Sequence, residues 1–149
     1  MRFYSVGEKI LLTLWVGSMW AIGYIAAPTL FAMLDDRMLA GTLAGQMFAA
    51  ISYIGLVCGG VLLSGKLFRR GKTCIHDGRT WVLLVMLIIV VVGQFVLQPM
   101  MAELRAIGIP EGSEEAVRFG RLHGAAAMLY LVNSLLGLML VVFGIEQES

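Results

Sequence analysis

Apolar residues fill four long windows of the chain, and each window is free of Asp, Glu, Lys and Arg. The windows cover residues 10–34, 38–65, 80–102 and 122–145. About 20 apolar residues are enough for a helix to cross the ~30 Å hydrocarbon core of a bilayer. The pattern therefore predicts an all-α integral membrane protein, a four-helix bundle that forms one transmembrane domain over 1–149, with helices near 9–34, 39–65, 80–102 and 113–145.

Composition supports the membrane prediction. Hydrophobic residues make up 59% of the chain and charged residues 14%, whereas about 25% of residues in soluble domains are charged. The first apolar window is longer than the roughly 7 to 15 apolar residues of a cleaved signal peptide, so we expect it to stay as a helix. The lipid bilayer is the expected partner, and a net charge of +1 gives no reason to expect nucleic-acid binding.

The orientation follows from the Lys and Arg residues, because positively charged flanks resist translocation. Most of them fall in the N-terminal segment and in the loop 66–79: Arg2, Lys9, Lys66, Arg69, Arg70, Lys72 and Arg79. The opposite side carries the others, set among acidic residues: Arg37, Arg105, Arg118 and Arg121. We therefore expect both termini and the loop 66–79 to be cytoplasmic, in the plasma membrane, which is the inner membrane of a bacterium.

Helices in lipid associate through close backbone approach and hydrogen bonds, so small and polar residues mark the packed faces. On the first helix this rule predicts an inward face of Thr13, Gly17, Trp20, Tyr24 and Pro28. Pro28 lacks an N–H and its ring crowds the preceding turn, which predicts a kink. On the second helix the rule predicts a seam through Gly41, Gly45, Ser52, Gly55 and Gly59, although 18 glycines also make such spacing common by chance.

The predicted topology sorts the polar side chains by depth. At ~1.5 Å of rise per residue, Ser18, Ser52 and Asn133 form a structural polar layer near the middle of the membrane. Asn133 should face the bundle interior, because hydrocarbon offers an amide no partner. Tyr24 and Gln94 fall in the outer half, and Gln98 and His123 lie nearer the outer surface.

These outer residues are the candidate ligand site, with His123, Tyr24, Gln94 and Gln98 opening toward the outer face. An imidazole with thioethers suits Cu(I), which makes His123, Met100 and Met101 the candidate metal ligands. An anionic ligand is the alternative, since Arg118 and Arg121 lie within two turns of His123. In the plainest interpretation the histidine only bonds a neighbouring polar group and the methionines are apolar filler.

Haem is a weaker candidate cofactor. His76 and His123 are predicted on opposite membrane faces, so one chain cannot supply two axial ligands, although an oligomer could. Cys58 and Cys74 are expected to be free thiols in a reducing environment. The chain shows no nucleophile with a base and no carboxylate pair at membrane depth, so we do not expect an enzyme. The alternatives are an accessory interaction module, as a homo-oligomer or in a larger membrane complex, and an oligomeric small-molecule transporter.

Three runs of the chain resemble the transmembrane protein 205-like family of small four-helix membrane proteins. They are LWVGSMWAIGYIAAPTLF from Leu14, LAGQMFAAISYIGLVCG from Leu43 and FGRLHGAAAMLYLVNSL from Phe119. The resemblance implies a four-helix membrane bundle with no settled activity. More distantly the chain is similar to copper-resistance protein D and to the haem-binding membrane protoporphyrinogen oxidase. It departs from their patterns in having one membrane-region histidine and no intramembrane lysine.

Overall fold

The computed structural model describes residues 2–144, and the described residues form helices and short connections with no strand. Four helical segments are long and apolar enough to cross a membrane: Val6–Met33, Arg37–Arg70, Gly78–Ile107 and Glu114–Phe143. The elements in chain order are α1 (Arg2–Ala21), η1 (Ile22–Ala26), α2 (Ala27–Met33), α3 (Arg37–Arg70), η2 (Gly71–His76), α4 (Gly78–Val92), η3 (Gly93–Leu97), α5 (Gln98–Ile107) and α6 (Glu114–Phe143).

The helices extend beyond their predicted bounds: α1 begins at Arg2 and not near residue 9, and α5 ends at Ile107 and not near residue 102. α3 continues to Arg70, so that Lys66, Arg69 and Arg70 belong to a helix and not to the predicted loop. The polypeptide between α3 and α4 is a short 3₁₀ helix. Ser113 caps α6 by accepting a hydrogen bond from the Ala116 N–H at 3.1 Å, as expected for a serine before a helix start. The predicted last helical residue, Ile145, lies outside the described residues.

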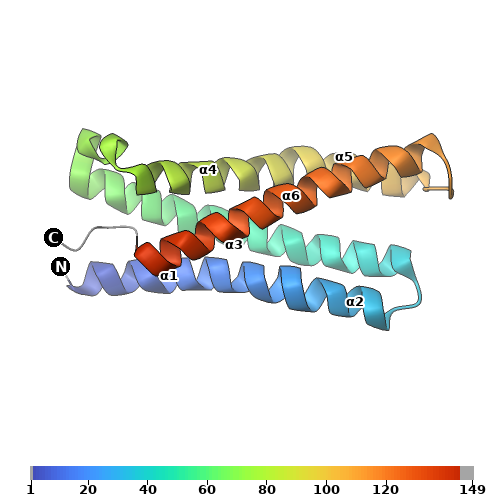
Figure 1. Ribbon diagram of the computed structural model, residues 1–149, viewed down its shortest axis with the longest axis horizontal. Helices are drawn as coiled ribbons and strands as arrows, with labels where there is room; N and C mark the ends of the chain where they lie inside the picture. The colour runs from blue at the N-terminus through green and yellow to red at the C-terminus, as the bar shows by residue number, and fades with distance from the viewer. Residues whose placement is uncertain (1, 145–149) are drawn as a thin grey trace.

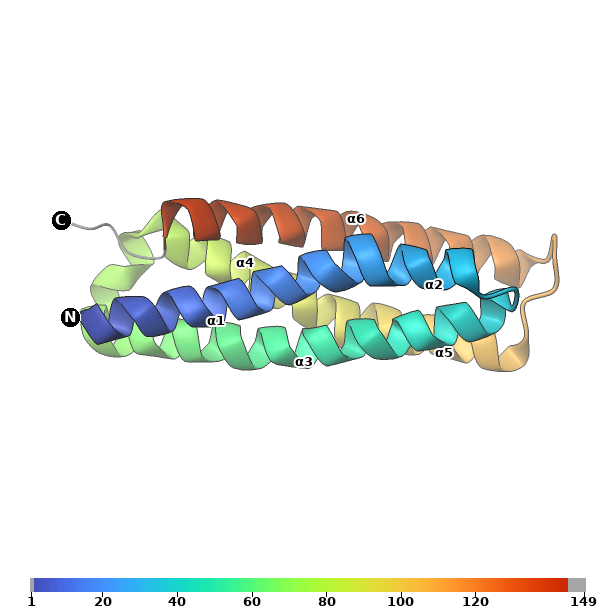
Figure 2. The ribbon, with the colours of Figure 1, turned by 90° about the horizontal axis from the view of Figure 1, so that it is seen from below.

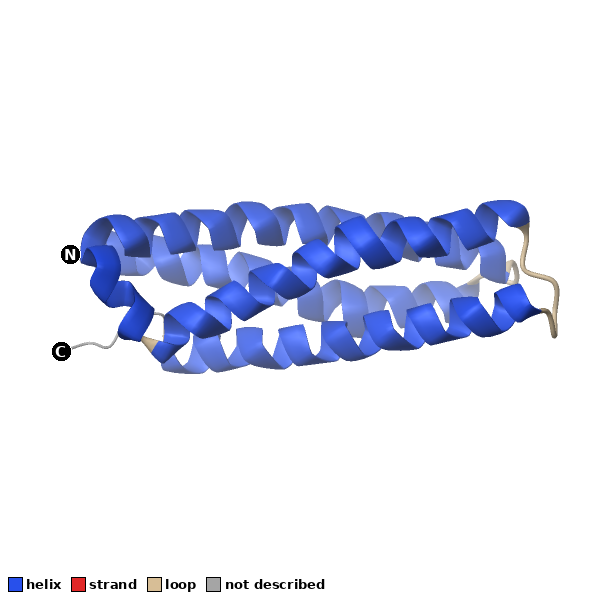
Figure 3. Cartoon of the chain, turned by 90° about the horizontal axis from the view of Figure 1, so that it is seen from above, coloured by secondary structure: helices blue, strands red, loops and turns tan. Residues whose placement is uncertain are grey.

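The four long segments lie side by side along the molecule (Figure 1). α1 packs against α3 and α6, and α4 packs against the same two helices. The start of α1, the end of α6 and η2 lie at one end, and the α2–α3 and α5–α6 connections lie at the other (Figure 2). Helix accounts for nearly the whole described chain, as the colouring by secondary structure shows (Figure 3). We call the end with η2 the η2 end and the opposite end the α5–α6 end.

Bulky residues of α1 pack against glycines of its neighbours in the core. Trp15 is fully buried. A Cβ built on Gly55 would lie 2.4 Å from Trp15 Nε1, and one on Gly59 would lie 2.9 Å from Trp15 Cζ3. A Cβ on Gly137 of α6 would similarly lie 2.8 Å from Val16 Cγ2. The predicted glycine seam of the second helix therefore does permit close approach, at Gly55 and Gly59, by admitting a large side chain.

Most of the predicted inward face of the first helix is wrong, although Trp20 and Tyr24 do reach Ser134 of α6 through hydrogen bonds. Its five members are exposed: Thr13, Gly17, Trp20, Tyr24 and Pro28. The buried face of α1 consists of Leu12, Trp15, Val16 and Met19. The physical reason is that small residues on one helix are matched by large residues on the next, so the small-residue rule identified the packed face of α3 but not that of α1.

A π-helical turn precedes each proline inside a helical segment. The Ala27 N–H donates to the Ile22 carbonyl just before Pro28, and the Gln98 N–H donates to the Gly93 carbonyl just before Pro99. A proline ring collides with the carbonyl four residues earlier and supplies no N–H to it. A wider turn removes the collision while the chain stays helical. The feature at Pro28 is therefore a π turn within the helical segment, where the sequence predicts a kink.

Candidate functional site

A first polar cluster, which we call the tyrosine cluster, joins the first helical segment to α6. The Ser134 hydroxyl donates to the Leu131 carbonyl at 2.9 Å and lies 2.7 Å from the Tyr24 hydroxyl. Since the serine proton is used within α6, Tyr24 is the donor of the bond between them. The Tyr130 hydroxyl donates to the Met19 carbonyl at 2.6 Å. The sequence analysis named Tyr24 as a candidate ligand residue, and it did not identify Ser134 as its partner.

Aromatic rings pack around these hydroxyl groups. Tyr24 lies 4.9 Å from Trp20 and 6.4 Å from Tyr130, measured between ring centroids. Phe48 of α3 meets Tyr130 edge to face at 5.1 Å. A Cβ on Gly23 would lie 2.4 Å from Tyr130 Cε1, so this glycine makes room for the tyrosine ring. The hydroxyl groups of the tyrosine cluster are satisfied within the protein, and the cluster therefore holds helices together.

The predicted polar layer is not joined by hydrogen bonds between its members. Ser18 donates to the Trp15 carbonyl and Ser52 to the Phe48 carbonyl, each at 2.8 Å and each within its own helix. Asn133 does reach across to another helix, with Nδ2 4.0 Å from the Met19 sulfur, and its side chain is buried. Its Oδ1 has no hydrogen-bond partner among the described residues.

Gln94 and Gln98 lie on η3 and α5, and both are half-buried. The Oε1 atom of Gln94 is buried and has no hydrogen-bond partner within residues 2–144. Within the described residues, the hydrogen bonds and ring contacts do not link either glutamine to His123 or to Tyr24. The structure thus separates the candidate ligand site into a tyrosine cluster, two half-buried glutamines and an exposed histidine.

His123 belongs to a second cluster at the α5–α6 end. Its imidazole is exposed and stacks on Phe119, one turn earlier, with centroids 6.1 Å apart and planes within 8°. The guanidinium carbon of Arg105, from α5, lies 5.8 Å from the Phe119 ring centroid. Arg105 Nη1 also donates to the Gly41 carbonyl of α3 at 3.0 Å, and its Nε donates to the Met101 carbonyl at 3.2 Å. We call Arg105, Phe119 and His123 the arginine stack.

The charge of Arg105 is half-buried and has no acidic partner among the residues that the structure describes. The two ion pairs found there join Lys66 to Asp77 and Arg69 to Glu8, both at the η2 end. Gly45 adds to the enclosure of the guanidinium, because a Cβ on it would lie 3.3 Å from Nη1. Sequence reasoning counted Arg105 only as a charge outside the membrane. The one sequence signal that could have identified it is the pair of glycines one turn apart on the facing helix.

No contact in the structure joins the candidate metal ligands to one another. Met101 is buried and Met100 half-buried on α5, whereas His123 is exposed on α6 and contacts Phe119. No group of three or more His, Cys, Asp or Glu side chains that could hold a metal ion occurs within residues 2–144. Copper through His123, Met100 and Met101 stays a prediction, as does haem.

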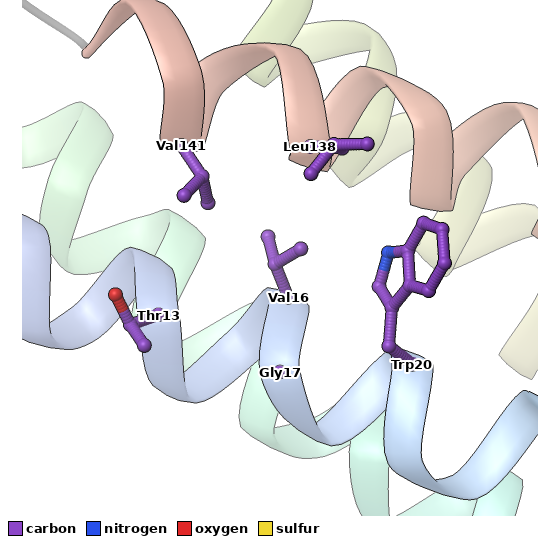
Figure 4. Close-up of a pocket in the computed structure, with 6 residues that line it drawn as sticks. All are labelled: Thr13, Val16, Gly17, Trp20, Leu138 and Val141. Atoms are coloured by element: carbon purple, nitrogen blue, oxygen red, sulfur yellow. The ribbon is translucent and has the colours of Figure 1, made fainter. Parts of the chain in front are cut away.

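An apolar groove runs between α1 and α6 on the outside of the molecule (Figure 4). Its volume is about 390 Å³, and Thr13, Val16, Gly17, Trp20, Leu138 and Val141 line it. A Cβ on Gly17 would meet no atom within 4 Å, so no side chain of the protein covers α1 at this position. This groove has room for an apolar chain or a side chain, but it offers little that could orient a polar ligand.

Comparison with protein families gives one match. The sequence model of the family DUF4149, a domain of unknown function, matches residues 10–109. No curated protein and no solved structure matches the chain. The matched region includes the first two of the three runs that resemble the transmembrane protein 205-like family, and it ends before Phe119 and His123. That finer family assignment stays a prediction.

Proposed function

The chain belongs to the DUF4149 family, and from this premise we propose that it is a multi-pass integral membrane protein whose α5–α6 end faces outward and binds an anionic group. The four helical segments contain 28, 34, 30 and 30 residues. At ~1.5 Å per residue each exceeds a ~30 Å hydrocarbon core, so the ends would reach into both headgroup layers. Large apolar side chains such as Ile25, Val57, Ile88 and Val142 are exposed, which suits hydrocarbon and not water.

The proposed orientation places the η2 end in the cytoplasm. The basic residues of that end support it through the positive-inside rule. The arginine stack then lies near the outer surface, because the charge-free window between Arg79 and Glu103 is long enough to cover the hydrocarbon core.

The observation that carries the ligand proposal is the Arg105 guanidinium, half-buried and without an acidic partner among the described residues. Two of its nitrogens donate to carbonyl groups, which keeps the side chain in place but does not neutralise it. A guanidinium presents five N–H donors in a planar fork that matches a carboxylate or phosphate. His123 is exposed beside the same phenylalanine and can add a further donor.

An anion fits this end better than copper does. Cu(I) requires converging soft ligands, whereas the ring of His123 is stacked on Phe119. Arg118 and Arg121 are exposed on α6 on either side of Phe119 and add positive charge. The anionic group belongs either to a free ion or to the headgroup of a lipid, and both would meet the arginine stack through phosphate or carboxylate oxygens.

Thermal unfolding of the purified protein in neutral detergent tests the proposal. Inorganic phosphate should raise the Tm of the unchanged protein, because a ligand that binds only the folded state stabilises it. Arg105→Lys keeps the charge but loses the fork, and it should abolish at least half of the rise. Arg37→Lys, an exposed arginine at the start of α3, is the matched control.

A second arm separates the two sources of the anion. The protein is reconstituted without phosphate in vesicles of zwitterionic lipid, with or without anionic phosphatidylglycerol. A rise in Tm that needs phosphatidylglycerol and depends on Arg105 identifies a headgroup, and a rise with phosphate alone identifies a free ion. Equal rises in Arg105→Lys and in Arg37→Lys in both arms would contradict the proposed site.

A second function is favoured by the exposed face of α1. Thr13 and Gly17 are small, lie one turn apart, and border the groove beside α6. Small residues on a lipid-facing helix let another helix approach closely. We propose as the alternative that this face makes the protein an interaction module, as a homo-oligomer or with another membrane protein. Gly17→Leu should then lower the molecular mass of the protein–detergent complex, while Gly7→Leu, at the η2 end of the same helix, should not.

A further inference from the structure

The four helical segments form two copies of one helical hairpin. Pro99 follows Pro28 by 71 residues, and the π turn η3 follows the π turn η1 by the same interval. The buried positions of the third segment follow those of the first at this interval too, with Leu83, Met86 and Val90 in the places of Leu12, Trp15 and Met19. Equal spacing of all three features indicates an internal repeat. We call α1 to α3 the first repeat and α4 to α6 the second repeat.

Gly59 of α3 and Gly137 of α6 occupy equivalent positions in the two repeats. The side chains that a Cβ on each glycine would meet are equivalent as well: Trp15 and Leu87 at Gly59, Met86 and Val16 at Gly137. Met86 follows Trp15, and Leu87 follows Val16, at the interval of the repeat. The two glycines thus have the same surroundings with the repeats exchanged. A pseudo-two-fold axis along the helices relates the repeats in this way.

Within residues 2–144, the packing between the repeats is closest near the η2 end. The members of the hydrophobic core on α1 and α4 all precede the π turns. There α1 packs against α6 and α4 packs against α3, so both helices cross to the other repeat. Beyond the π turns, α2 packs against α3 and α5 against α6, each within its own repeat. The α5–α6 end therefore consists of a first arm, α2 with the start of α3, and a second arm, α5 with the start of α6 (Figure 1).

The first arm is joined to the second repeat beside its π turn. The Tyr24 hydroxyl of η1 bonds the Ser134 hydroxyl of α6, and the Tyr130 hydroxyl of α6 bonds the Met19 carbonyl of α1. The equivalent of Tyr24 in η3 is Phe95, which has no hydroxyl group. The π turn of the second repeat therefore lacks the hydrogen bond that fixes the π turn of the first.

The second arm is joined to the first by Arg105. Its Nη1 donates to the Gly41 carbonyl at the start of α3 at 3.0 Å. A Cβ on Gly45 would lie 3.3 Å from the same nitrogen, so the guanidinium lies close against α3. Among the described residues no other hydrogen bond connects the two arms, and this contact therefore sets how closely they approach.

Both helices of the second arm contain a point at which they can bend. α4 continues into α5 through η3, and helices commonly bend at π turns. α6 contains Gly120 and Gly124, and a Cβ on either would meet nothing within 4 Å, so packing does not require a glycine at these positions. Glycine inside a helix stabilises it less than alanine does, which makes α6 easier to bend there.

We propose that the second arm opens and closes against the first arm, with η3 as its hinge and the hydrogen bond from Arg105 to Gly41 as the contact that holds it closed. An anion bound to Arg105 competes with the Gly41 carbonyl for the guanidinium and thereby releases the arm. This release rests on the proposed anion binding, whereas the hinged arm does not. In the proposed orientation the arms open toward the outer side of the membrane.

Electron–electron distance measurements between two spin labels test the opening. The labels are attached at Asp35→Cys and Glu111→Cys, exposed positions between α2 and α3 and between α5 and α6, after both native cysteines are replaced by alanine. Arg105→Gln should raise the ratio of longer to shorter distances about tenfold or more, since a hydrogen bond from a charged group is lost. Arg37→Gln, at an exposed arginine at the start of α3, is the matched control and should leave the ratio unchanged.

Two further measurements separate the hinge from the release. Pro99→Ala restores an N–H and removes the ring that favours the π turn, so it should lower the population of longer distances. It decides alone should Arg105→Gln not fold, and a distance distribution unaltered by these substitutions would overturn the hinged arm. Inorganic phosphate should raise the longer distances in the unchanged protein. If Arg105→Gln raises them and phosphate does not, although phosphate raises the Tm, release of the arm by an anion is wrong while anion binding stands.

Discussion

Lys66 and Asp77 form an ion pair in which Nζ lies 2.7 Å from Oδ2, and the lysine side chain is 0% exposed. The pair joins the end of α3 to the N-cap of α4, since the Asp77 carboxylate also accepts a hydrogen bond from the Arg79 N–H at 3.0 Å. Lys66, which the sequence analysis counted in the loop 66–79, is thus a buried residue that links two helices at the η2 end.

Acid should weaken this pair. Burial by itself raises the pKa of the Asp77 carboxyl, but the hydrogen bonds from Lys66 and Arg79 and the charges of Lys66 and Arg70 outweigh it and lower that pKa. A carboxyl whose pKa is lowered by folding stabilises the folded state above its ordinary pKa of about 4, and this contribution disappears as the pH falls through the lowered value.

Asp77→Asn therefore has two expected consequences. At neutral pH it leaves a buried lysine without its carboxylate, which costs about 3 to 5 kcal/mol in comparable buried pairs. Between about pH 5 and pH 2 the variant should lose less stability than the unchanged protein, because it lacks the titrating carboxyl. Thermal unfolding across this range measures both, with Glu8→Gln at the other pair of the η2 end as the control. Parallel pH profiles in the two proteins would refute this role of Asp77.

Gly55 should tolerate no side chain, because a Cβ there would lie 2.4 Å from Nε1 of the fully buried Trp15. Gly55→Ala should lower stability by about 1 to 3 kcal/mol through overpacking. Gly60→Ala is a matched control on the same helix, since a Cβ at Gly60 would meet nothing within 4 Å. It should be neutral or stabilise by up to about 1 kcal/mol, the helix propensity that alanine adds. Equal effects of the two substitutions would show that α1 does not pack on α3 through Gly55.

Tyr24 and Ser134 should be energetically coupled through the hydrogen bond between their hydroxyl groups. A double-mutant cycle with Tyr24→Phe and Ser134→Ala isolates that bond. The expected coupling is about 0.5 to 1.5 kcal/mol, the range for hydrogen bonds between membrane helices. Thr42→Ala serves as the control, because its hydroxyl bonds the Met38 carbonyl of its own helix. If the two substitutions change the free energy of unfolding additively, the bond between Tyr24 and Ser134 does not help to hold the helices together.

The helices could be predicted from the sequence because each charge-free apolar window is long enough to cross a membrane, and length and composition are properties of each segment alone. The packed face of α1 could not, since Trp15 is buried only because Gly55 and Gly59 of another helix make room for it. The arginine stack was missed for the same reason. Nothing near Arg105 in the chain shows that the Gly41 carbonyl will be its partner, which lies 64 residues away.

Position along a helix is easier to infer than lateral contact. Nothing in the sequence pattern links Tyr24 of the first helical segment to Tyr130 of α6, although their rings are neighbours. Counting residues gives height along a helix, whereas the direction of a side chain depends on how the helices rotate against one another. This is why His123 could be expected at the α5–α6 end, yet its stacking on Phe119 and the nearness of Arg105 required the structure.

Cysteine labelling from one side of the membrane tests the central claim most directly, namely four crossings with the η2 end inside and the arginine stack outside. Cys58 and Cys74 are both buried, so they are poor reporters and should first be replaced by alanine. Exposed positions then receive single cysteines, His76→Cys at the η2 end and Glu111→Cys between α5 and α6. In intact cells an impermeant maleimide should modify the cysteine at 111 and should reach the one at 76 only after permeabilisation. The reverse pattern would contradict the orientation, and modification of both in intact cells would contradict a membrane-spanning arrangement that separates them.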